Sequence, residues 1–175
     1  MDILGAALQD YFLTGKAETL WVYNSYGEDE VMPVDLFFRN EDEMPELELK
    51  ALDLCRGHVL DIGAGAGSHA LVLQQRNIKV TALDISTRAV AIMKQRGVKD
   101  AIEMNIFEMP ADQQYDTLLF MMNGIGVTGT ISGMKAFLKK AKSYLRAGGQ
   151  LIFDSSDISY LYQEVPFPLN AYYGE

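Results

Sequence analysis

The sequence predicts an α/β fold with a doubly wound, mainly parallel sheet, and three observations carry this prediction. From about residue 57 onward, short apolar runs alternate with segments of helical periodicity. The first of these runs leads through a glycine-rich turn into a helical pattern. The length of 175 residues and the apolar content of 49% are typical of one globular domain with a sizeable core.

Five strands are expected in this periodic part of the chain. The fourth apolar run is apolar on both faces, which is typical of a central parallel strand. A glycine pair at residues 148–149 turns the chain into the last run. The five predicted strands comprise residues 58–62, 79–84, 101–105, 117–121 and 150–154.

Helices are expected between these strands and before them. Ser68 and Ser86 are candidate N-caps of the two helices that follow the first and second strands, and Gly97 is a candidate stop for the second of these helices. A later segment carries one apolar face at helical spacing. The predicted helices comprise residues 2–14, 41–56, 68–76, 87–96 and 132–145.

The negative charge of the chain is concentrated in its N-terminal part. Residues 1–50 hold 12 acidic and three basic side chains, whereas the other residues balance, so the net charge of −9 arises in this part. The excess indicates either a solvated acidic face or an acidic lid that favours cationic substrates. It argues against binding to nucleic-acid phosphates. We therefore predict an N-terminal acidic helical or lid segment at residues 1–44 and a second domain at residues 45–175.

Composition also excludes several other classes of protein. The longest apolar run, residues 118–122, is far shorter than the roughly 20 residues that span a bilayer. The chain begins without the pattern of a secretory signal. Cys55 stands alone, so no internal disulfide and no cysteine-rich zinc site can form. We expect a cytoplasmic protein with no membrane partner and no metal site.

The glycine-rich turn carries the most specific motif, Asp61-Ile62-Gly63-Ala64-Gly65-Ala66-Gly67. Glycines let a ligand approach the main chain, and the helix that follows presents free N–H groups. The dinucleotide fingerprint fits imperfectly, because Ser68 stands where glycine or alanine is required. The complete pattern, Asp-x-Gly-x-Gly-x-Gly, resembles the first motif of class I S-adenosylmethionine-dependent methyltransferases.

Further landmarks that resemble this family follow in the family's order. Asp84 ends the second strand, where the family's carboxylate accepts the ribose hydroxyls, and Ile85 resembles the residue that packs on adenine. Asn105 stands where the third-strand motif usually has aspartate. Residues 114–118 and 145–152 resemble the fourth- and fifth-strand motifs.

The resemblance covers about residues 45–154 and implies a Rossmann-like sheet. With the strands numbered along the chain, the implied order is 3-2-1-4-5. The two further strands of the family sheet have no counterpart in the tail, so we expect them to be missing or truncated, unless residues 160–175 supply a minimal edge. An exposed edge would favour a homodimer.

The resemblance implies S-adenosyl-L-methionine as the cofactor. The acid and the glycines would hold its amino-acid end, and the later residues its adenosine. No catalytic residue is assigned, because methyl transfer depends on orientation more than on a base. The implied cofactor-binding residues are Asp61, Gly63, Ala64, Gly65, Gly67, Asp84, Ile85, Asn105, Ile106, Met122 and Asn123.

Several other polar or aromatic residues are not assigned to the cofactor site. His58 precedes the first strand at the wrong end of the sheet, and Asp116 begins the fourth strand. His69 is expected to support the glycine loop. The aromatic stretch with Trp21, Tyr23 and Tyr26 is predicted to be irregular or a lid. Together with Tyr11, these residues are expected either to close over the cofactor or to pack in the core or on the surface.

The expected function is methyl transfer from S-adenosylmethionine to a small molecule, and the acidic segment makes a cationic acceptor one option. Base methylases of the family often carry Asn/Asp-Pro-Pro-aromatic after the fourth strand, where this chain has Asn123-Gly124-Ile125-Gly126. Two alternatives stay open: a nicotinamide-dependent oxidoreductase and a non-catalytic cofactor-binding module.

Overall fold

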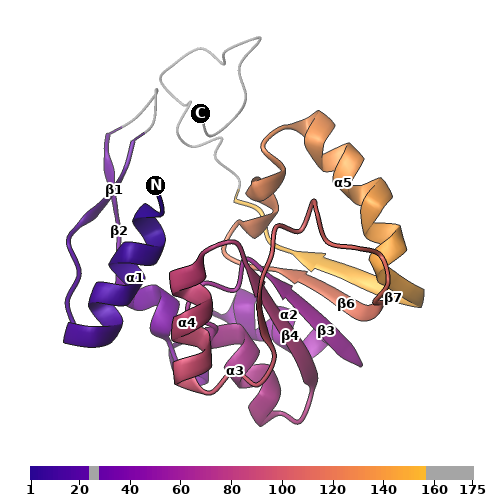
Figure 1. Cartoon of the computed structure of the whole chain (residues 1–175), viewed down its shortest axis with the longest axis horizontal. Helices are drawn as coiled ribbons and strands as arrows, with labels where there is room; N and C mark the ends of the chain where they lie inside the picture. The colour runs from indigo at the N-terminus through magenta and orange to yellow at the C-terminus, as the bar shows by residue number, and fades with distance from the viewer. Residues whose placement is uncertain (24–27, 157–175) are drawn as a thin grey trace.

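The computed structural model describes residues 1–23 and 28–156, and its centre is a five-stranded parallel sheet (Figure 1). The strand order is β5-β4-β3-β6-β7, which is the predicted order 3-2-1-4-5. The Rossmann-like fold class is therefore confirmed. The strands are β3 (His58–Ile62), β4 (Lys79–Asp84), β5 (Ala101–Glu103), β6 (Tyr115–Phe120) and β7 (Leu145–Phe153).

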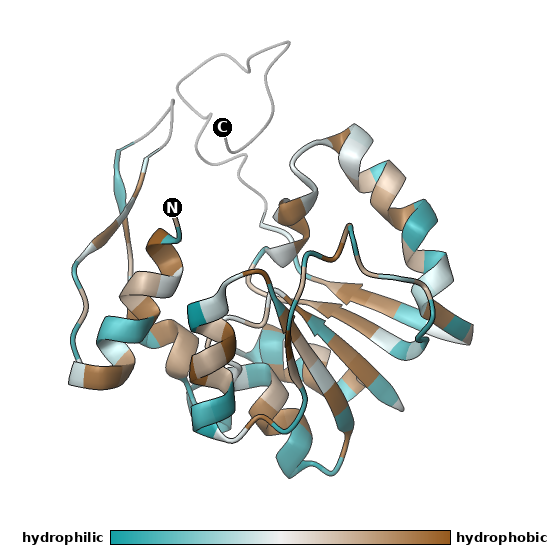
Figure 2. Cartoon of the chain, in the orientation of Figure 1, coloured by the Kyte–Doolittle hydropathy of each residue, from teal (hydrophilic) through white to brown (hydrophobic). Residues whose placement is uncertain are grey.

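Successive residues of β3 belong to different cores, because neighbouring side chains of a strand point to opposite faces. Val59 packs in the core that α2 (Glu46–Leu54), α3 (Ser68–Gln75) and α4 (Thr87–Arg96) cover. Leu60 packs in the core that α5 (Ile131–Tyr144) covers. Figure 2 shows apolar stretches along the strands and alternating polar and apolar patches along α5. The sheet is thus covered on both faces.

The N-terminal segment packs on α4 beside the glycine loop. α1 (Ile3–Thr14) contributes Leu8, and the short 3₁₀ helix η1 (Val34–Phe38) contributes Val34, to a third apolar cluster that includes Ala66 of the loop. A hairpin of β1 (Leu20–Val22) and β2 (Glu30–Met32) projects beyond α1 (Figure 1). This packing brings residues before position 45 to the carboxyl edge of the main sheet.

The structure corrects the predicted course of the N-terminal third. Residues 20–22 and 30–32 pair as an antiparallel hairpin, so the prediction of irregular structure is wrong there, and the lid stays a prediction. The predicted helix 41–56 is divided into η2 (Glu41–Glu43) and α2. Met44 between them is extended (ψ 139°), because the residue before a proline avoids the helical region.

Two predicted helix ends are confirmed and one predicted cap is wrong. Ser86 accepts the N–H of Ala89 at 3.0 Å, and Gly97 ends α4 in the left-handed region. Ser68, however, is the first residue of α3, and Gly67 occupies the cap position. The hydroxyl of Ser68 turns to the N-terminal segment, as described below.

Some predictions fall on residues that the structure does not describe. The predicted edge at residues 160–175 and the side chain of Tyr26 lie outside the described residues. In the described part of the chain, β5 and β7 form the edges of the main sheet. No helix there has the length and apolarity to cross a bilayer. The homodimer and the domain boundary at residue 45 stay predictions.

Candidate functional site

A cavity of about 550 Å³ opens at the carboxyl ends of the central strands. Ligands of open α/β sheets bind at this edge, close to the point where the strand order reverses. Here the reversal lies between β3 and β6, since β3 is followed on its other side by β4. The cavity is lined by Ile62 at the end of β3, Asp84 at the end of β4 and Met121 just beyond β6.

The first part of the glycine loop, Gly63 and Ala64, lines this cavity. Gly63 lines the cavity with φ +73°, and a Cβ built there would meet no atom within 4 Å. The N–H groups of Gly63 and Ala64 donate to the carbonyl of Leu83, at 2.8 and 3.1 Å, which ties the loop to β4. The loop therefore offers open main chain to a ligand.

Gly67 serves the packing of the loop and does not line the cavity. It adopts φ +83°, and a Cβ there would lie 2.9 Å from both Cγ of Met93 and Cγ2 of Val98. Contact at that distance is closer than a side chain can accept, so glycine allows the loop to approach α4. The assignment of Gly67 as a ligand contact stays a prediction, and its observed partners are apolar side chains.

Asp84 and the glycine loop lie next to each other. Oδ2 of Asp84 accepts the N–H of Gly65 at 2.8 Å, and Oδ1 accepts the N–H of Ser86 at 2.9 Å. Burial raises the pKa of Asp84, and these two hydrogen bonds oppose the shift. A backbone hydrogen bond from Ile85 acts in the same direction. A carboxylate can accept about four hydrogen bonds, so Asp84 keeps capacity for a ligand hydroxyl. The glycine loop and Asp84, which were predicted to hold one ligand, thus line the same cavity.

Asp61 is a buried carboxyl group beneath the loop. It is 2% exposed, and its Oδ2 has no hydrogen-bond partner in the described structure. Burial raises its pKa to about 6, the nearby Asp84 adds to the shift, and the charge of His69 opposes it. A buried polar atom without a partner is costly, so this oxygen is a candidate ligand contact.

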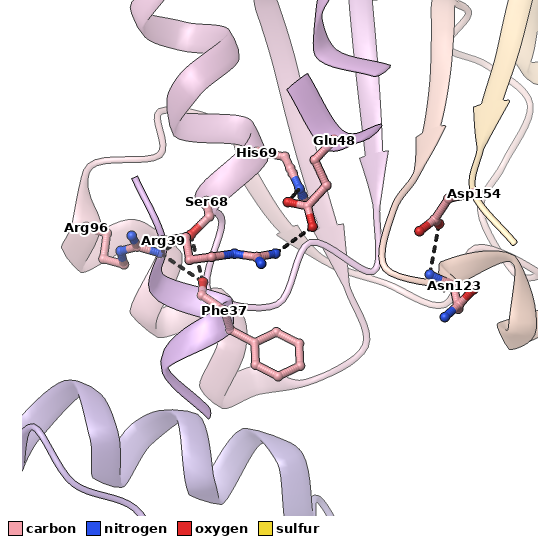
Figure 3. Close-up of polar contacts among 8 residues, drawn as sticks. All are labelled: Phe37, Arg39, Glu48, Ser68, His69, Arg96, Asn123 and Asp154. Atoms are coloured by element: carbon pink, nitrogen blue, oxygen red, sulfur yellow. Dashed lines mark hydrogen bonds and ion pairs between the residues drawn. The ribbon is translucent and has the colours of Figure 1, made fainter. Parts of the chain in front are cut away.

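The cavity also holds an ion-pair cluster that the sequence analysis missed. Glu48 accepts from Nη2 of Arg39 at 2.5 Å and pairs with Nε2 of His69 at 2.9 Å (Figure 3). Burial alone would raise the pKa of Glu48, but the hydrogen bonds and charges of His69 and Arg39 outweigh it and leave the pKa lowered. All three residues line the cavity, so His69 lies at the site instead of behind the loop.

Two weak sequence signals pointed to this cluster. Arg39 is one of only three basic residues among the first 50, where acidic residues dominate. Glu48 falls on the same helical face as the buried Ala51 and Leu52, a position where an unpaired charge would be destabilising. Neither signal identifies a partner, because the three residues come from separate segments of the chain.

A second cluster anchors η1 to the glycine loop. The hydroxyl of Ser68 donates to the carbonyl of Phe37 at 2.7 Å (Figure 3). Arg96 donates to the carbonyls of Phe38 and Ala66, at 3.2 and 2.7 Å. The guanidinium of Arg96 also lies 5.0 Å from the ring centroid of Phe38. These contacts hold η1, and with it Arg39, against the cavity.

The N-terminal segment supplies an apolar wall that was not predicted in detail. The aromatic residues Trp21 and Tyr23, which were candidates to close over the cofactor, are exposed and do not line the cavity. Tyr11 instead packs on Phe38, with ring centroids 4.9 Å apart. The wall residues from this segment are Leu4, Met32, Leu36 and Phe37.

The other predicted site residues divide into two groups. Ala64, Ile85, Asn105, Ile106 and Met122 line the cavity, whereas the side chain of Asn123 is directed elsewhere. Oδ1 of Asn123 accepts the N–H of Ser156 at 2.9 Å, and its own N–H donates to Asp154 at 2.8 Å (Figure 3). Asn123 and Met122 both have φ near +58°, so this turn is conformationally unusual. Asn123 holds the turn in this structure.

The structural roles predicted for residues at the opposite end of the sheet agree with their contacts. Asp116 accepts the N–H of His58 at 2.7 Å and pairs with Arg146 at 2.6 Å. The ring of His58 contacts the hydroxyl of Thr81 at 2.9 Å. Cys55 is buried in the apolar core, which raises its pKa to about 12. Among the described residues, no group of His, Cys, Asp and Glu side chains could hold a metal ion.

Comparisons with known proteins all match methyltransferases. The family model described as "Methyltransferase domain" matches residues 59–149. The solved structure of an SAM-dependent methyltransferase from Bacteroides fragilis, in complex with S-adenosyl-L-homocysteine, has a TM-score of 0.85 and 43% identity, covering 91% of this chain and 67% of that one.

Curated relatives match over a shorter stretch. Ribosomal RNA small subunit methyltransferase C of Aliivibrio salmonicida is 32% identical over 119 residues, which is 64% of this chain and 35% of the relative. An uncharacterized methyltransferase of Staphylococcus carnosus is 32% identical over 85 residues, 49% of this chain and 39% of the relative. The chain thus spans little more than a third of the length of these curated relatives.

Proposed function

The chain belongs to the class I S-adenosylmethionine-dependent methyltransferases, and on that premise we propose that it binds S-adenosylmethionine and methylates a small-molecule acceptor. One observation carries the proposal. The glycine loop and Asp84, joined by a 2.8 Å hydrogen bond from Gly65, line a single cavity at the carboxyl edge of the sheet. The solved relative with 43% identity was crystallised with the demethylated form of this cofactor.

The residues of the cavity fit the parts of this cofactor. The unpartnered Oδ2 of Asp61 suits an ammonium group, and the open main chain at Gly63 suits the adjoining amino-acid carbons. The carboxylate of Asp84, which lines the cavity, suits the ribose hydroxyls as an acceptor. Ile85 and Ile106 offer apolar surface to a flat purine ring.

The protein's contribution to the reaction is orientation and exclusion of water. S-adenosylmethionine supplies, when bound, a methyl group that its sulfonium sulfur activates for displacement. The chain must hold the acceptor's lone pair on the axis of the breaking bond, and alignment of this kind can be worth roughly 7–11 kcal/mol. The apolar wall of Leu4, Met32, Leu36 and Phe37 would limit the access of water to a bound acceptor. No side chain is assigned as a general base.

A small molecule is favoured over RNA as the acceptor by charge. The cavity wall comes partly from the N-terminal segment, and the first 50 residues carry 12 acidic side chains against three basic ones. A phosphate backbone would be repelled there, whereas a neutral or cationic molecule with an apolar body would not. RNA methylation is the second candidate function, because one relative with 32% identity is a ribosomal RNA methyltransferase.

Calorimetric titration tests the cofactor. We expect S-adenosylmethionine and S-adenosylhomocysteine to bind in the micromolar range or tighter, and NADH to release no heat. Binding of NADH without binding of either adenosyl compound would contradict the proposed cofactor and favour a nicotinamide-dependent oxidoreductase.

Isotope transfer tests the acceptor. The protein is incubated with methyl-labelled S-adenosylmethionine and either a small-molecule extract or total RNA. Label in the small-molecule fraction is the expected result. Label in RNA alone contradicts the small-molecule acceptor, and no label in either, despite cofactor binding, favours a non-catalytic module.

A further inference from the structure

The β1–β2 hairpin projects from the N-terminal segment, and α5 lies at the opposite side of the molecule (Figure 1). We propose that these two elements form an interaction pair between copies of this chain, in which the hairpin of one copy docks on the exposed face of α5 of a second copy. The inference depends on neither the cofactor nor the acceptor and goes beyond the proposed function.

The outer face of the hairpin carries large apolar side chains that stay exposed in the described structure. Trp21 of β1 and Val31 of β2 are register partners, so they lie on one face, and they are 51% and 50% exposed. Tyr23, two residues beyond Trp21, is 73% exposed. The other face turns inward, since Leu20 packs on the third apolar cluster and Met32 lines the cavity. A two-stranded hairpin is marginally stable in water, so burial of its outer face would stabilise it.

The hairpin is also flanked by carboxylates. Glu18 precedes β1, Asp29 precedes β2, and Glu30 begins β2, and all three are exposed. Within the described residues, none of the three takes part in an ion pair. The hairpin thus presents an apolar face beside unpaired negative charges.

The exposed face of α5 has the opposite charge. Its residues Ile131, Lys135, Lys139 and Lys142 follow one another at spacings of four, four and three, so they share one side of the helix, and all are exposed. In the part of the chain that the structure describes, the three lysines form no ion pair, whereas Lys140, outside this face, donates to a backbone carbonyl. This face therefore combines an apolar end with three unpaired positive charges.

The two charges are segregated along the chain. Residues 1–50 carry a net charge of −9, whereas residues 117–153 hold five basic side chains and no acidic one. The hairpin and α5 of one copy are separated across the molecule (Figure 1), so the complementary surfaces can meet only between copies. Because the two surfaces differ, the copies would join head to tail.

The two surfaces also match in size and kind. From Ile131 to Lys142 the helix rises about 17 Å, and four residues of a strand extend about 13 Å. Trp21 and Tyr23 can pack on Ile131 and on the apolar stems of the lysines, with the ammonium groups directed to the carboxylates around them. Attraction between exposed charges is screened by salt, so the association is weak and depends on ionic strength.

Sedimentation velocity of the full chain tests the association and its charge dependence. We expect reversible self-association at low salt that weakens at least about tenfold as the ionic strength rises from about 0.02 M to about 0.5 M. Reversing the lysine face should leave the protein monomeric; this variant combines Lys135→Glu, Lys139→Glu and Lys142→Glu. The matched control has the same net charge but reverses exposed lysines elsewhere and should associate as wild type does; it combines Lys50→Glu, Lys79→Glu and Lys99→Glu.

A charge exchange identifies the second copy as the partner. Reversal of the hairpin charges by Glu18→Lys, Asp29→Lys and Glu30→Lys should also give a monomer. When this variant is mixed with the lysine-face variant, complexes should form again, because each protein then meets opposite charge at both of its surfaces. Restored association also shows that both variants are folded.

The apolar part of the contact is tested separately. Trp21→Ala should weaken self-association by about tenfold or more, because large aromatic side chains dominate the energy of interfaces. Leu47→Ala, which truncates a 60% exposed side chain on α2, is the matched control and should have no effect.

Three results would overturn the proposal. The first is a wild-type chain that stays monomeric at low salt up to about 0.2 mM, a concentration at which even weak specific contacts are populated. The second is self-association that the lysine-face variant retains. The third is a mixture of the two folded, monomeric charge variants in which no complex forms. If the wild-type chain is monomeric and binds labelled single-stranded RNA through the lysine face, the partner of α5 is a nucleic acid and the proposal is wrong.

Discussion

Asp61 is the residue at which binding and stability conflict most directly. Burial raises its pKa from the ordinary 3.8 to about 6. Because the pKa in the folded protein exceeds that of the unfolded chain, the stability contributed by the protonated form is complete below pH 3.8 and is lost as the pH rises through about 6. At neutral pH the fold therefore contains an unfavourable buried charge. A ligand ammonium would remove this penalty.

The first prediction concerns the pH dependence of cofactor binding. An ammonium ligand requires ionised Asp61, so we expect the affinity for S-adenosylhomocysteine to rise about tenfold from pH 5 to pH 7. Asp84, whose pKa is also raised by burial, acts in the same direction, and the charge of His69 opposes the shift at Asp61. Calorimetry across this range measures the profile.

Asp61→Asn is the control for this profile. It should flatten the rise near pH 6 and bind the ligand weakly throughout. Without ligand at pH 7.5 it should be more stable than wild type, by up to about 3 kcal/mol, since the buried charge is gone. A variant that retains the full pH dependence would show that another group controls it.

The second prediction concerns Asp84 as the acceptor for the ribose. Asp84→Ala removes charge-assisted hydrogen bonds, so we expect S-adenosylhomocysteine binding to weaken by about 1–3 kcal/mol. The same loss is expected with 5′-deoxy-5′-methylthioadenosine, which has the same nucleoside and thioether without the amino-acid end, because both ligands contain the ribose. Calorimetric titration of both ligands shows whether the loss arises at the nucleoside that they share.

Glu103→Ala provides a matched control for Asp84. Glu103 pairs with Asp84 in the register of β4 and β5, ends its own strand and does not line the cavity. It should bind both ligands as wild type does. If Asp84→Ala keeps its affinity, Asp84 has no contact with the ligand.

At the scale of elements, the loop between β3 and α3 divides its glycines between two tasks. Gly63 faces open space in the cavity, whereas Gly67 faces Met93 and Val98 of the α4 side. Both have positive φ, so a side chain at either position adds about 1–2 kcal/mol of backbone strain. Only Gly67 adds a steric overlap within the core.

The third prediction uses this difference. We expect Gly67→Ala to be the less stable variant in denaturant titrations, because its Cβ would lie 2.9 Å from two core side chains. Gly63→Ala should unfold at higher denaturant than Gly67→Ala and should show the larger loss of affinity relative to its loss of stability. Equal stability of the two variants would contradict the assignment of Gly67 to packing.

At the scale of the whole molecule, the cavity joins two parts of the chain with different compositions. The carboxyl edge of the sheet supplies the loop and the carboxylates, and the acidic N-terminal segment supplies Arg39 and an apolar wall. Ligand binding should therefore stabilise the contact between α1, η1 and the sheet, beyond any local effect on the loop.

The fourth prediction is a ligand-induced rise in thermal stability. A ligand at 100 times its dissociation constant adds about 2.7 kcal/mol, which corresponds to roughly 5–10 °C in Tm for a domain of this size. We expect this rise with S-adenosylhomocysteine in a thermal scan and no shift with NADH at the same concentration. A rise with NADH alone would contradict the proposed cofactor.

The sheet and the carboxylate edge could be predicted because their signals are local. Alternating apolar runs set the strands, and Asp61 and Asp84 each follow or end such a run. Since parallel strands bring their carboxyl ends to one edge, the proximity of these two acids follows from the strand order. The observed strand boundaries differ from the predicted ones by a few residues. The largest difference is at β7, which begins at Leu145 instead of residue 150.

The N-terminal third could not be derived in the same way. The β1–β2 hairpin is two strands of three residues, and Pro45 interrupts the pattern expected for one helix. Arg39, Glu48 and His69 meet only because α2, α3 and η1 pack together, and pairwise contacts between distant segments leave no periodic signal. Ser68 likewise bonds the carbonyl of Phe37 across 31 residues in place of a local cap.

The sequence by itself determined the α/β class, the strand order, the glycine loop with its two carboxylates, and the excess of negative charge before residue 50. These properties depend on neighbours in the chain or on the rules of parallel sheets. Only the tertiary structure decided that Arg39 lines the cavity, that the side chain of Asn123 bonds to Ser156, and that, among the described residues, Nε of Arg39 and Oδ2 of Asp61 are buried without a hydrogen-bond partner. The physical reason is that burial and pairing are set by segments that are remote in sequence and adjacent in space.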